Sequence, residues 1–193
     1  LHFLNRVMSL IDSEVIRQYN DDGAAVVRGC ISDHWLEILN DAIEHDIRDP
    51  GPFVHAYQAG SGGGRFHGNL RTWETEARFQ DFCFNSPLPE MAAEILASAK
   101  INLLYDQLFV KEPGTPNRTR WHNDQPYWAM RGWQVLSFWV ALDPVNKRSG
   151  ALEFIPGSHR WGRWFQPETF SKGTGIEEYE RNPDYEPIPD IES

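Results

Sequence analysis

The sequence contains little of what marks membrane proteins, disulfide-rich secreted proteins or nucleic-acid-binding proteins. Its 193 residues include only two cysteines, Cys30 and Cys83, which are too few for a disulfide scaffold and match no metal or redox spacing. No segment approaches the roughly 18 consecutive apolar residues of a transmembrane helix. The net charge of -10 argues against binding to nucleic acid, which needs a basic surface. We therefore expect a cytoplasmic protein without a membrane or nucleic-acid partner.

Aromatic residues, in contrast, are concentrated in one part of the chain. They make up 13% of the residues, and four of the eight tryptophans fall between positions 121 and 139. Ordinary core packing accounts for some of these rings, but Trp121, Tyr127 and Trp128 flank a polar and charged run. Because ligand sites are mostly apolar with a few polar groups, we interpret these three side chains as the wall of a pocket.

The first hundred residues are predicted to be mainly helical. Capping residues and apolar residues at helical spacing predict helices from Asp12 to about Asn20, from Ser32 or Asp33 to Ile47, and from Pro87 or Pro89 through Leu96. Residues 24–28 are a candidate short strand between the first two helices.

A glycine-rich segment, residues 60–64, lies between the second and third predicted helices. A dinucleotide-binding repeat would need glycine at position 65, where Arg65 stands, and no Gly-Lys-Ser/Thr follows. We therefore interpret the segment as a flexible loop or the edge of a lid. His55 and His67 flank it, and they are weaker candidates for contact with a pocket.

Strands replace helices from about residue 100. Alternating apolar residues predict strands over 101–111, 133–142 and 151–155, each followed by a turn that contains proline or glycine. Short strands separated by turns, without helices between them, favour an antiparallel sandwich or jelly roll over an α/β sheet.

Residues 121–124, Trp-His-Asn-Asp, contain a His-x-Asp pair. Side chains two residues apart in an extended segment point the same way, so the imidazole of His122 and the carboxylate of Asp124 can converge on one point. The pair supplies two ligands of the 2-His-1-carboxylate site of non-heme Fe(II) oxygenases. Three-residue patterns recur by chance, so the surrounding motifs carry the argument.

Residues 101–162 resemble the phytanoyl-CoA dioxygenase family of Fe(II)- and 2-oxoglutarate-dependent oxygenases. The matching motifs occur in order: Lys-Glu-Pro-Gly at 111–114, Trp-His-Asn-Asp-Gln-Pro-Tyr-Trp at 121–128, Ser-Phe-Trp-Val-Ala-Leu-Asp at 137–143, Ser-Gly-Ala-Leu at 149–152 and Ile-Pro-Gly-Ser-His at 155–159. The resemblance implies an α+β protein, mainly β with a helical N-terminal part, whose strands form a double-stranded β-helix, that is, a cupin-like jelly roll. We expect one oxygenase domain over 1–193, with helical support at 1–100, the strands and metal motif at 101–165, and an acidic loop at 166–193.

The same resemblance implies the chemistry and the site. His122 and Asp124 would be the catalytic iron ligands. Residues near the co-substrate 2-oxoglutarate would be Thr119, Trp139, Leu108 and Asn69. Residues of the substrate pocket would be Asp106, Gln125, Tyr127 and Trp128. The enzyme would use O2 to hydroxylate an unactivated C–H bond of a small molecule, with release of succinate and CO2, and the residues do not select among acyl-CoA thioesters, amino-acid-like solutes and natural-product intermediates.

The chain departs from the family pattern in its third ligand. Family members supply a distal histidine and, beyond it, an arginine for 2-oxoglutarate, both after the Pro-Gly-Ser-His turn. After Asp124 this sequence has a single histidine, His159, within that turn, and the family does not normally use it as a ligand. Three or four strands cannot close a jelly roll of about eight. We therefore expect that this chain lacks the C-terminal strands of the jelly roll and the third ligand.

Two other hypotheses stay open at this point. A zinc hydrolase can also use His-x-Asp, although it usually has further histidines nearby, and residues 117–131 contain one. A jelly-roll module could instead keep the pocket and bind its ligand without a metal or catalysis.

Overall fold

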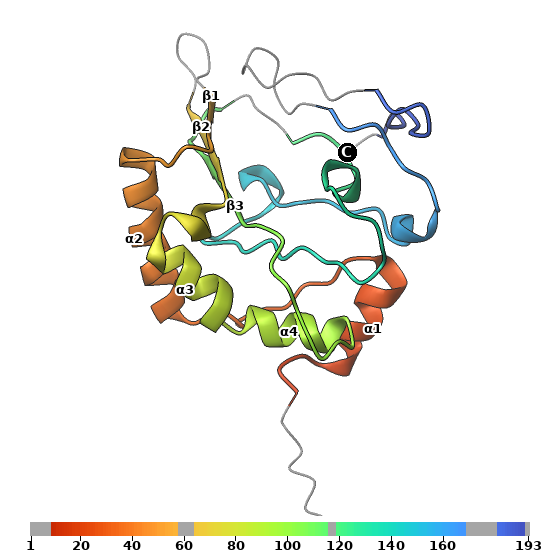
Figure 1. The fold of residues 1–193 in the computed structure, drawn as a ribbon, viewed down its shortest axis with the longest axis horizontal. Helices are drawn as coiled ribbons and strands as arrows, with labels where there is room; N and C mark the ends of the chain where they lie inside the picture. Colours follow the sequence, from red (N-terminus) through yellow and green to blue (C-terminus); the bar gives the residue numbers. More distant parts are fainter. Residues whose placement is uncertain (1–8, 58–63, 116–118, 169–180, 192–193) are drawn as a thin grey trace, which may run out of the picture. The chain divides into compact units, whose positions relative to one another are not determined.

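The computed structural model describes residues 9–57, 64–115, 119–168 and 181–191 (Figure 1). The chain divides into two compact units, each made of three stretches that are separated in the sequence. Unit 1 comprises Leu1–Glu44, Glu76–Leu104 and Gln134–Trp161, and unit 2 comprises His45–Thr75, Tyr105–Trp133 and Gly162–Ser193. The single domain expected from the sequence stays a prediction.

Helices dominate unit 1. They are α1 (Ser13–Asp22), α2 (Asp33–Arg48), whose last residues belong to unit 2, α3 (Ala77–Asn85) and α4 (Leu88–Ile95). Buried apolar side chains on these helices include Leu39, Ala42, Phe79, Phe82, Met91 and Ala92. Three of the four helices confirm the sequence prediction. Helix α3 was not predicted, although Phe79 and Phe82 stand at helical spacing and both are buried.

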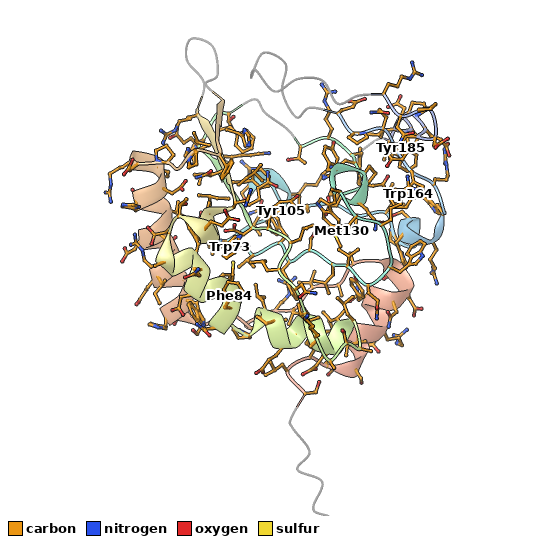
Figure 2. The ribbon with its side chains drawn as sticks, viewed as in Figure 1. Trp73, Phe84, Tyr105, Met130, Trp164 and Tyr185 are labelled. Carbon is orange, nitrogen blue, oxygen red and sulfur yellow. The ribbon has the colours of Figure 1, made fainter. Side chains whose placement is uncertain are left out.

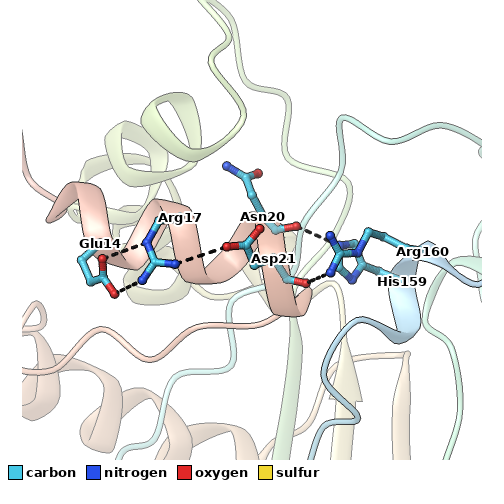
Figure 3. A network of polar contacts seen from close by, with 6 residues as sticks. All are labelled: Glu14, Arg17, Asn20, Asp21, His159 and Arg160. Carbon is cyan, nitrogen blue, oxygen red and sulfur yellow. Dashed lines mark hydrogen bonds and ion pairs between the residues drawn. The ribbon is translucent and has the colours of Figure 1, made fainter.

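The C-terminal end of α1 is closed by a distant turn of the same unit (Figure 3). The last carbonyls of a helix have no partner within it, and here residues 157–160 supply the donors. The Gly157 amide donates to Asp22 at 2.8 Å, His159 Nε2 to Asn20 at 3.1 Å, and Arg160 Nη2 to Asp21 at 2.5 Å. The single histidine after Asp124 therefore caps a helix in unit 1.

Unit 2 contains a three-stranded antiparallel sheet of order β1-β2-β3. The strands are β1 (Val54–Tyr57), β2 (Phe66–Leu70) and β3 (Gln107–Lys111). In the central strand, residues 66–69 are all buried. Its sequence, Phe-His-Gly-Asn-Leu, is short and contains glycine and asparagine, which are depleted in strands, and this explains why the sequence did not predict it. Of the predicted strand 101–111, residues 107–111 are confirmed.

The structure assigns no strand to three other segments for which the sequence predicted one. Residues 24–28, 133–142 and 151–155 form no ladder with any described residue. Alternating side chains favour an extended backbone, but a strand also needs a hydrogen-bonded neighbour. Large side chains in these segments are exposed, with Val26 at 62%, Trp133 at 74% and Phe154 at 61%.

Some expectations fall on residues outside the description. These are residues 60–63 of the glycine-rich segment and residues 169–180 and 192–193 of the expected acidic loop. Gly64 is described, and a Cβ atom there would lie 2.3 Å from the carbonyl oxygen of Pro113, so this glycine permits a close backbone approach before β2. Of the helices in the described ranges, none has the length and apolar character that crossing a bilayer requires.

Replacing Gly23 tests the closure of α1. Gly23 follows the helix at φ 84°, and a Cβ atom there would lie 2.4 Å from Nδ1 of His159. Gly23→Ala should lower the free energy of unfolding by about 1–2 kcal/mol for the left-handed backbone and by about 1 kcal/mol more for the displaced His159 hydrogen bond. Urea denaturation measures the loss.

Gly29→Ala is the matched control, because Gly29 also has a positive φ of 68° but no atom within 4 Å of the added Cβ. It should show the backbone cost alone. Equal losses in the two variants would mean that contact between Gly23 and His159 contributes nothing to stability.

Candidate metal centre

The His-x-Asp motif lies after β3 in unit 2. Lys111, the last residue of β3, donates from Nζ to Oγ1 of Thr119 at 3.1 Å. Asp124 then precedes the short 3-10 helix η2 (Gln125–Tyr127) with helical backbone angles, φ -71° and ψ -44°. The motif is therefore bent at Asp124, and the extended geometry assumed from the sequence is wrong at this residue.

The two side chains nevertheless converge. His122 Nε2 lies 3.1 Å from Asp124 Oδ1. The His122 side chain is 24% exposed and that of Asp124 is 52% exposed, so the pair stands at the surface of unit 2 with the imidazole partly covered. A solute or ion can therefore approach the point at which these two atoms meet.

Two neighbours fix the orientation of the His122 ring. Its Nδ1 lies 2.7 Å from the carbonyl oxygen of Arg120. A carbonyl oxygen only accepts hydrogen bonds, so Nδ1 carries a proton and donates. The ring of Tyr127 packs edge-on against the imidazole, with centroids 5.9 Å apart and planes at 86°. Nε2 is consequently the nitrogen directed at Asp124.

This arrangement changes the acidity of His122. Burial of the ring lowers the pKa of His122, but the hydrogen bonds to Asp124 and to the Arg120 carbonyl, together with the Asp124 charge, outweigh burial and raise the pKa above its usual value. Acceptors lie against both ring nitrogens, so a positive charge is favoured at Nε2. That charge can be a proton or a metal ion.

The pair fits a metal by the chemistry of its donors. An imidazole nitrogen and a carboxylate oxygen are both ligands of non-heme iron in proteins, and here these two atoms lie 3.1 Å apart. A ligating histidine typically donates its other N–H to a carbonyl or carboxylate, as His122 does to Arg120. Within the described ranges, no group of three His, Cys, Asp or Glu side chains could hold a metal. His122 and Asp124 thus match two protein ligands.

An aromatic pocket of about 310 Å³ follows the motif in unit 2. Its lining residues are Gln125, Trp128, Ala129, Met130, Arg131, Trp164 and Tyr185, of which Met130, Trp164 and Tyr185 are labelled in Figure 2. The rings of Trp164 and Tyr185 are nearly parallel at 6.3 Å, and the guanidinium of Arg131 lies over Trp164 at 6.0 Å. None of these lining residues is acidic.

The predicted substrate residues have defined partners in unit 2. Gln125 Nε2 donates to the carbonyl of Gly132 at 2.7 Å, and Trp128 Nε1 donates to the hydroxyl of Tyr105 at 2.9 Å. Gln125 and Trp128 therefore line the aromatic pocket with a side-chain N–H of each already engaged. Tyr127 lies against His122 instead.

Asp106, the remaining predicted substrate residue, connects β3 to the 3-10 helix η1 (Thr72–Glu74). Its carboxylate accepts hydrogen bonds from the Thr72 hydroxyl and, at 3.2 Å, from the Trp73 amide. Burial raises the pKa of Asp106, although these hydrogen bonds act in the opposite direction. The contacts favour a structural role for this residue over contact with substrate.

Two of the predicted co-substrate residues are neighbours in the sheet. Asn69 of β2 pairs with Leu108 of β3, and the residues are 1% and 8% exposed. Asn69 Nδ2 donates to Asp46 Oδ1 at 2.7 Å, and its Oδ1 accepts from the Leu70 amide at 2.9 Å. Because its polar atoms are engaged, a structural role is favoured for Asn69 over contact with 2-oxoglutarate.

Sequence reasoning missed the centre of this buried network, Asp46. Its Oδ2 lies 2.7 Å from His67 Nε2, and both side chains are 4% exposed. The carboxylate thus connects the last turn of α2 to β2 through two residues, His67 and Asn69. A buried carboxylate needs such partners, and the polar residues at 67 and 69 of a short apolar segment were the available signal.

The other two predicted co-substrate residues lie in different units. Thr119 is exposed in unit 2 and bonded to Lys111. Trp139 belongs to unit 1 and is 47% exposed. Their contact with 2-oxoglutarate stays a prediction. Arg131, Trp164 and Tyr185 of the pocket were also missed, and the last two have no local sequence signal.

An imidazole and a carboxylate that converge supply two of the three protein ligands of a non-heme Fe(II) oxygenase site. The family model for phytanoyl-CoA dioxygenase matches residues 19–189, so the chain belongs to this family. The family has a jelly-roll fold and comprises oxygenases that typically use Fe(II) and 2-oxoglutarate. Comparison with curated proteins gave no match, and neither did comparison with solved structures.

The raised pKa of His122 predicts a pH dependence of stability in the metal-free protein. A group whose pKa is higher in the folded than in the unfolded state stabilises the fold while it is protonated. This contribution should be complete below about pH 6.5, the usual value for an unfolded chain, and should disappear as the pH rises through the folded pKa of His122.

Asp124→Asn removes the carboxylate charge and should remove this part of the pH dependence. Urea denaturation of both proteins between pH 5.5 and pH 9, in steps of about 0.5 pH unit, gives the free energy of unfolding as a function of pH for the comparison. Parallel curves for the two proteins would show that Asp124 does not act on the protonation of His122.

Proposed function

We propose that this chain is an Fe(II)- and 2-oxoglutarate-dependent dioxygenase that hydroxylates an unactivated C–H bond of a small molecule, with release of succinate and CO2. One observation carries the proposal: His122 Nε2 and Asp124 Oδ1 converge at 3.1 Å while Nδ1 is held by a main-chain carbonyl. Family membership supports the class of reaction, and the His122–Asp124 pair indicates where in the chain the metal would bind.

Iron and 2-oxoglutarate, when bound, supply the activation of O2 and the oxidation of the substrate. The protein's own part is to bind and to orient. His122 and Asp124 would hold the metal, and the Arg120 carbonyl accepts from Nδ1, which would leave the lone pair of Nε2 for the ion. The ring of Tyr127 packs T-shaped against the imidazole and helps to orient it.

The aromatic pocket is the substrate site in this proposal. Its volume of about 310 Å³ falls at the lower end of the range for small-molecule sites. Aromatic walls bind an apolar body, and Arg131 favours an anionic group because the lining includes no acidic residue. A small apolar acid is therefore the substrate class that these residues fit best.

Substitution of the two ligands tests the reaction. His122→Ala and Asp124→Ala should each abolish iron-dependent succinate formation from 2-oxoglutarate, because each removes one metal ligand, and circular dichroism should show an intact fold. His34→Ala, at an exposed histidine of α2, is the matched control and should retain activity.

Metal analysis of the wild-type protein distinguishes the alternatives. Iron together with succinate formation supports the dioxygenase. Zinc without succinate would favour a hydrolase, and the absence of both would favour a binding module. Full activity in either ligand variant would refute the assignment of His122 and Asp124.

Substitution of Arg131 tests the substrate site. Two probes of similar shape, indole-3-propionate and tryptamine, differ in the sign of their charge. Loss of a charge-assisted hydrogen bond at a partly exposed site costs about 1.5 kcal/mol, so Arg131→Gln should weaken binding of the anion roughly tenfold in calorimetric titration.

Arg148→Gln is the control, because Arg148 is exposed on the 3-10 helix η3 (Lys147–Ser149) of unit 1. It should leave the affinity for both probes unchanged. If Arg131→Gln binds the anion as tightly as the wild type, the pocket has no anion preference and the proposed substrate class is wrong.

A further inference from the structure

Glu168 contacts Arg120, which precedes His122, and Tyr127, which follows it, although Glu168 lies 46 positions after His122 in the chain. Its carboxylate Oε2 pairs with Nη1 of Arg120 at 2.6 Å. Its backbone forms two hydrogen bonds with one side-chain atom: the Tyr127 hydroxyl donates to the Glu168 carbonyl at 2.9 Å and accepts from the Glu168 amide at 3.0 Å. All of these residues belong to unit 2.

Arg120 and Tyr127 are also the two residues that orient the His122 ring. The carbonyl of Arg120 accepts from Nδ1, and the ring of Tyr127 packs T-shaped against the imidazole. Glu168 therefore holds, through one ion pair and two hydrogen bonds, both of the groups that determine the direction of Nε2.

The segment that carries Glu168 is itself fixed. Phe165 forms a parallel bridge with Glu186, the Gln166 amide donates to the Glu186 carbonyl at 2.8 Å, and the Glu186 amide donates to the Trp164 carbonyl at 2.8 Å. Arg163 adds an ion pair to the Glu186 carboxylate. Glu168 thus extends from a short hydrogen-bonded platform, formed by residues 163–166 and 182–186, towards the metal motif.

Because the Arg120–Glu168 ion pair is exposed, its effect on stability and its effect on metal affinity can be measured separately. The side chains of Arg120 and Glu168 are 52% and 47% exposed, and exposed ion pairs contribute little to stability. Metal affinity is far more sensitive, because loss of a group that orients a ligand typically lowers it 10–100-fold. The two roles therefore predict different measurements.

We propose that Glu168 is a positioning residue for the metal ligand His122, acting through the guanidinium of Arg120 and the hydroxyl of Tyr127. The role of His122 as a ligand rests on the proposed function. The orientation of its ring is a separate property, which can be measured without any metal.

Co(II) titration followed by visible absorption tests the proposal in the metal-bound protein. Glu168→Gln, which keeps the shape but loses the charge, and Tyr127→Phe, which keeps the ring against His122 but loses the hydroxyl, should each weaken Co(II) binding about tenfold. The melting temperature of the metal-free variants should stay at the wild-type value. Exchange of the charges in Arg120→Glu/Glu168→Arg should recover part of the affinity.

Glu153→Gln is the matched control. Glu153 is a carboxylate of similar exposure, 41%, that pairs with Lys147 at 3.0 Å in unit 1, so its loss should leave Co(II) affinity unchanged. Wild-type affinity in both Glu168→Gln and Tyr127→Phe would overturn the proposal. A loss of affinity that only follows a loss of melting temperature would overturn it too, because the role would then be structural.

Nitrogen-15 spectra of the metal-free protein, recorded where His122 is protonated, provide the independent measurement. The wild type should show a slowly exchanging Nδ1 proton, because the Arg120 carbonyl accepts it, and this proton should exchange faster with water in Glu168→Gln and Tyr127→Phe. If the wild type binds no Co(II), the proposed function fails while this measurement still decides the positioning role. Wild-type exchange of the Nδ1 proton in both variants would overturn it.

Discussion

One imidazole placed between two hydrogen-bond acceptors is the constraint on which the rest of this site depends. His122 faces the Arg120 carbonyl with one nitrogen and the Asp124 carboxylate with the other. A neutral ring carries a single proton and can satisfy only one acceptor, so the arrangement requires a cation at Nε2. The same requirement explains the raised pKa of His122 in the protein without metal and its suitability as a ligand, because a divalent ion can take the place of the second proton.

Sequence predicted the parts of the fold that local interactions determine. Helix α1 begins at the predicted Asp12, whose side chain accepts from the Glu14 amide, and α2 and α4 follow apolar spacing that can be read within a few turns. The strands were predicted poorly because pairing partners are distant in sequence. Strand β2 is buried on both faces and depends on Asp46, 21 and 23 residues before the two side chains that it binds. Alternation alone predicted strands over 133–142 and 151–155, for which no described residue provides a partner.

The residues of the candidate site also fall into two groups, those recognisable from a local motif and those that only the fold brings together. The His122–Asp124 pair was recognisable because both residues stand in one short motif with ordered neighbours, even though the backbone bends at Asp124 where an extended segment was assumed. Glu168, Trp164 and Tyr185 were not recognisable, since they reach the motif only through the fold. For Asn69, burial and the bond to Asp46 favour a role in supporting the sheet, and its contact with 2-oxoglutarate stays a prediction.

The acceptor that orients His122 belongs to the main chain. Nδ1 donates to the carbonyl oxygen of Arg120, and every amino acid supplies that oxygen. A substitution at position 120 can therefore remove the ion pair with Glu168, but a main-chain acceptor for Nδ1 is present whatever the side chain. An insertion between positions 120 and 122 would displace that acceptor, so this hydrogen bond is more sensitive to insertions and deletions than to point substitutions.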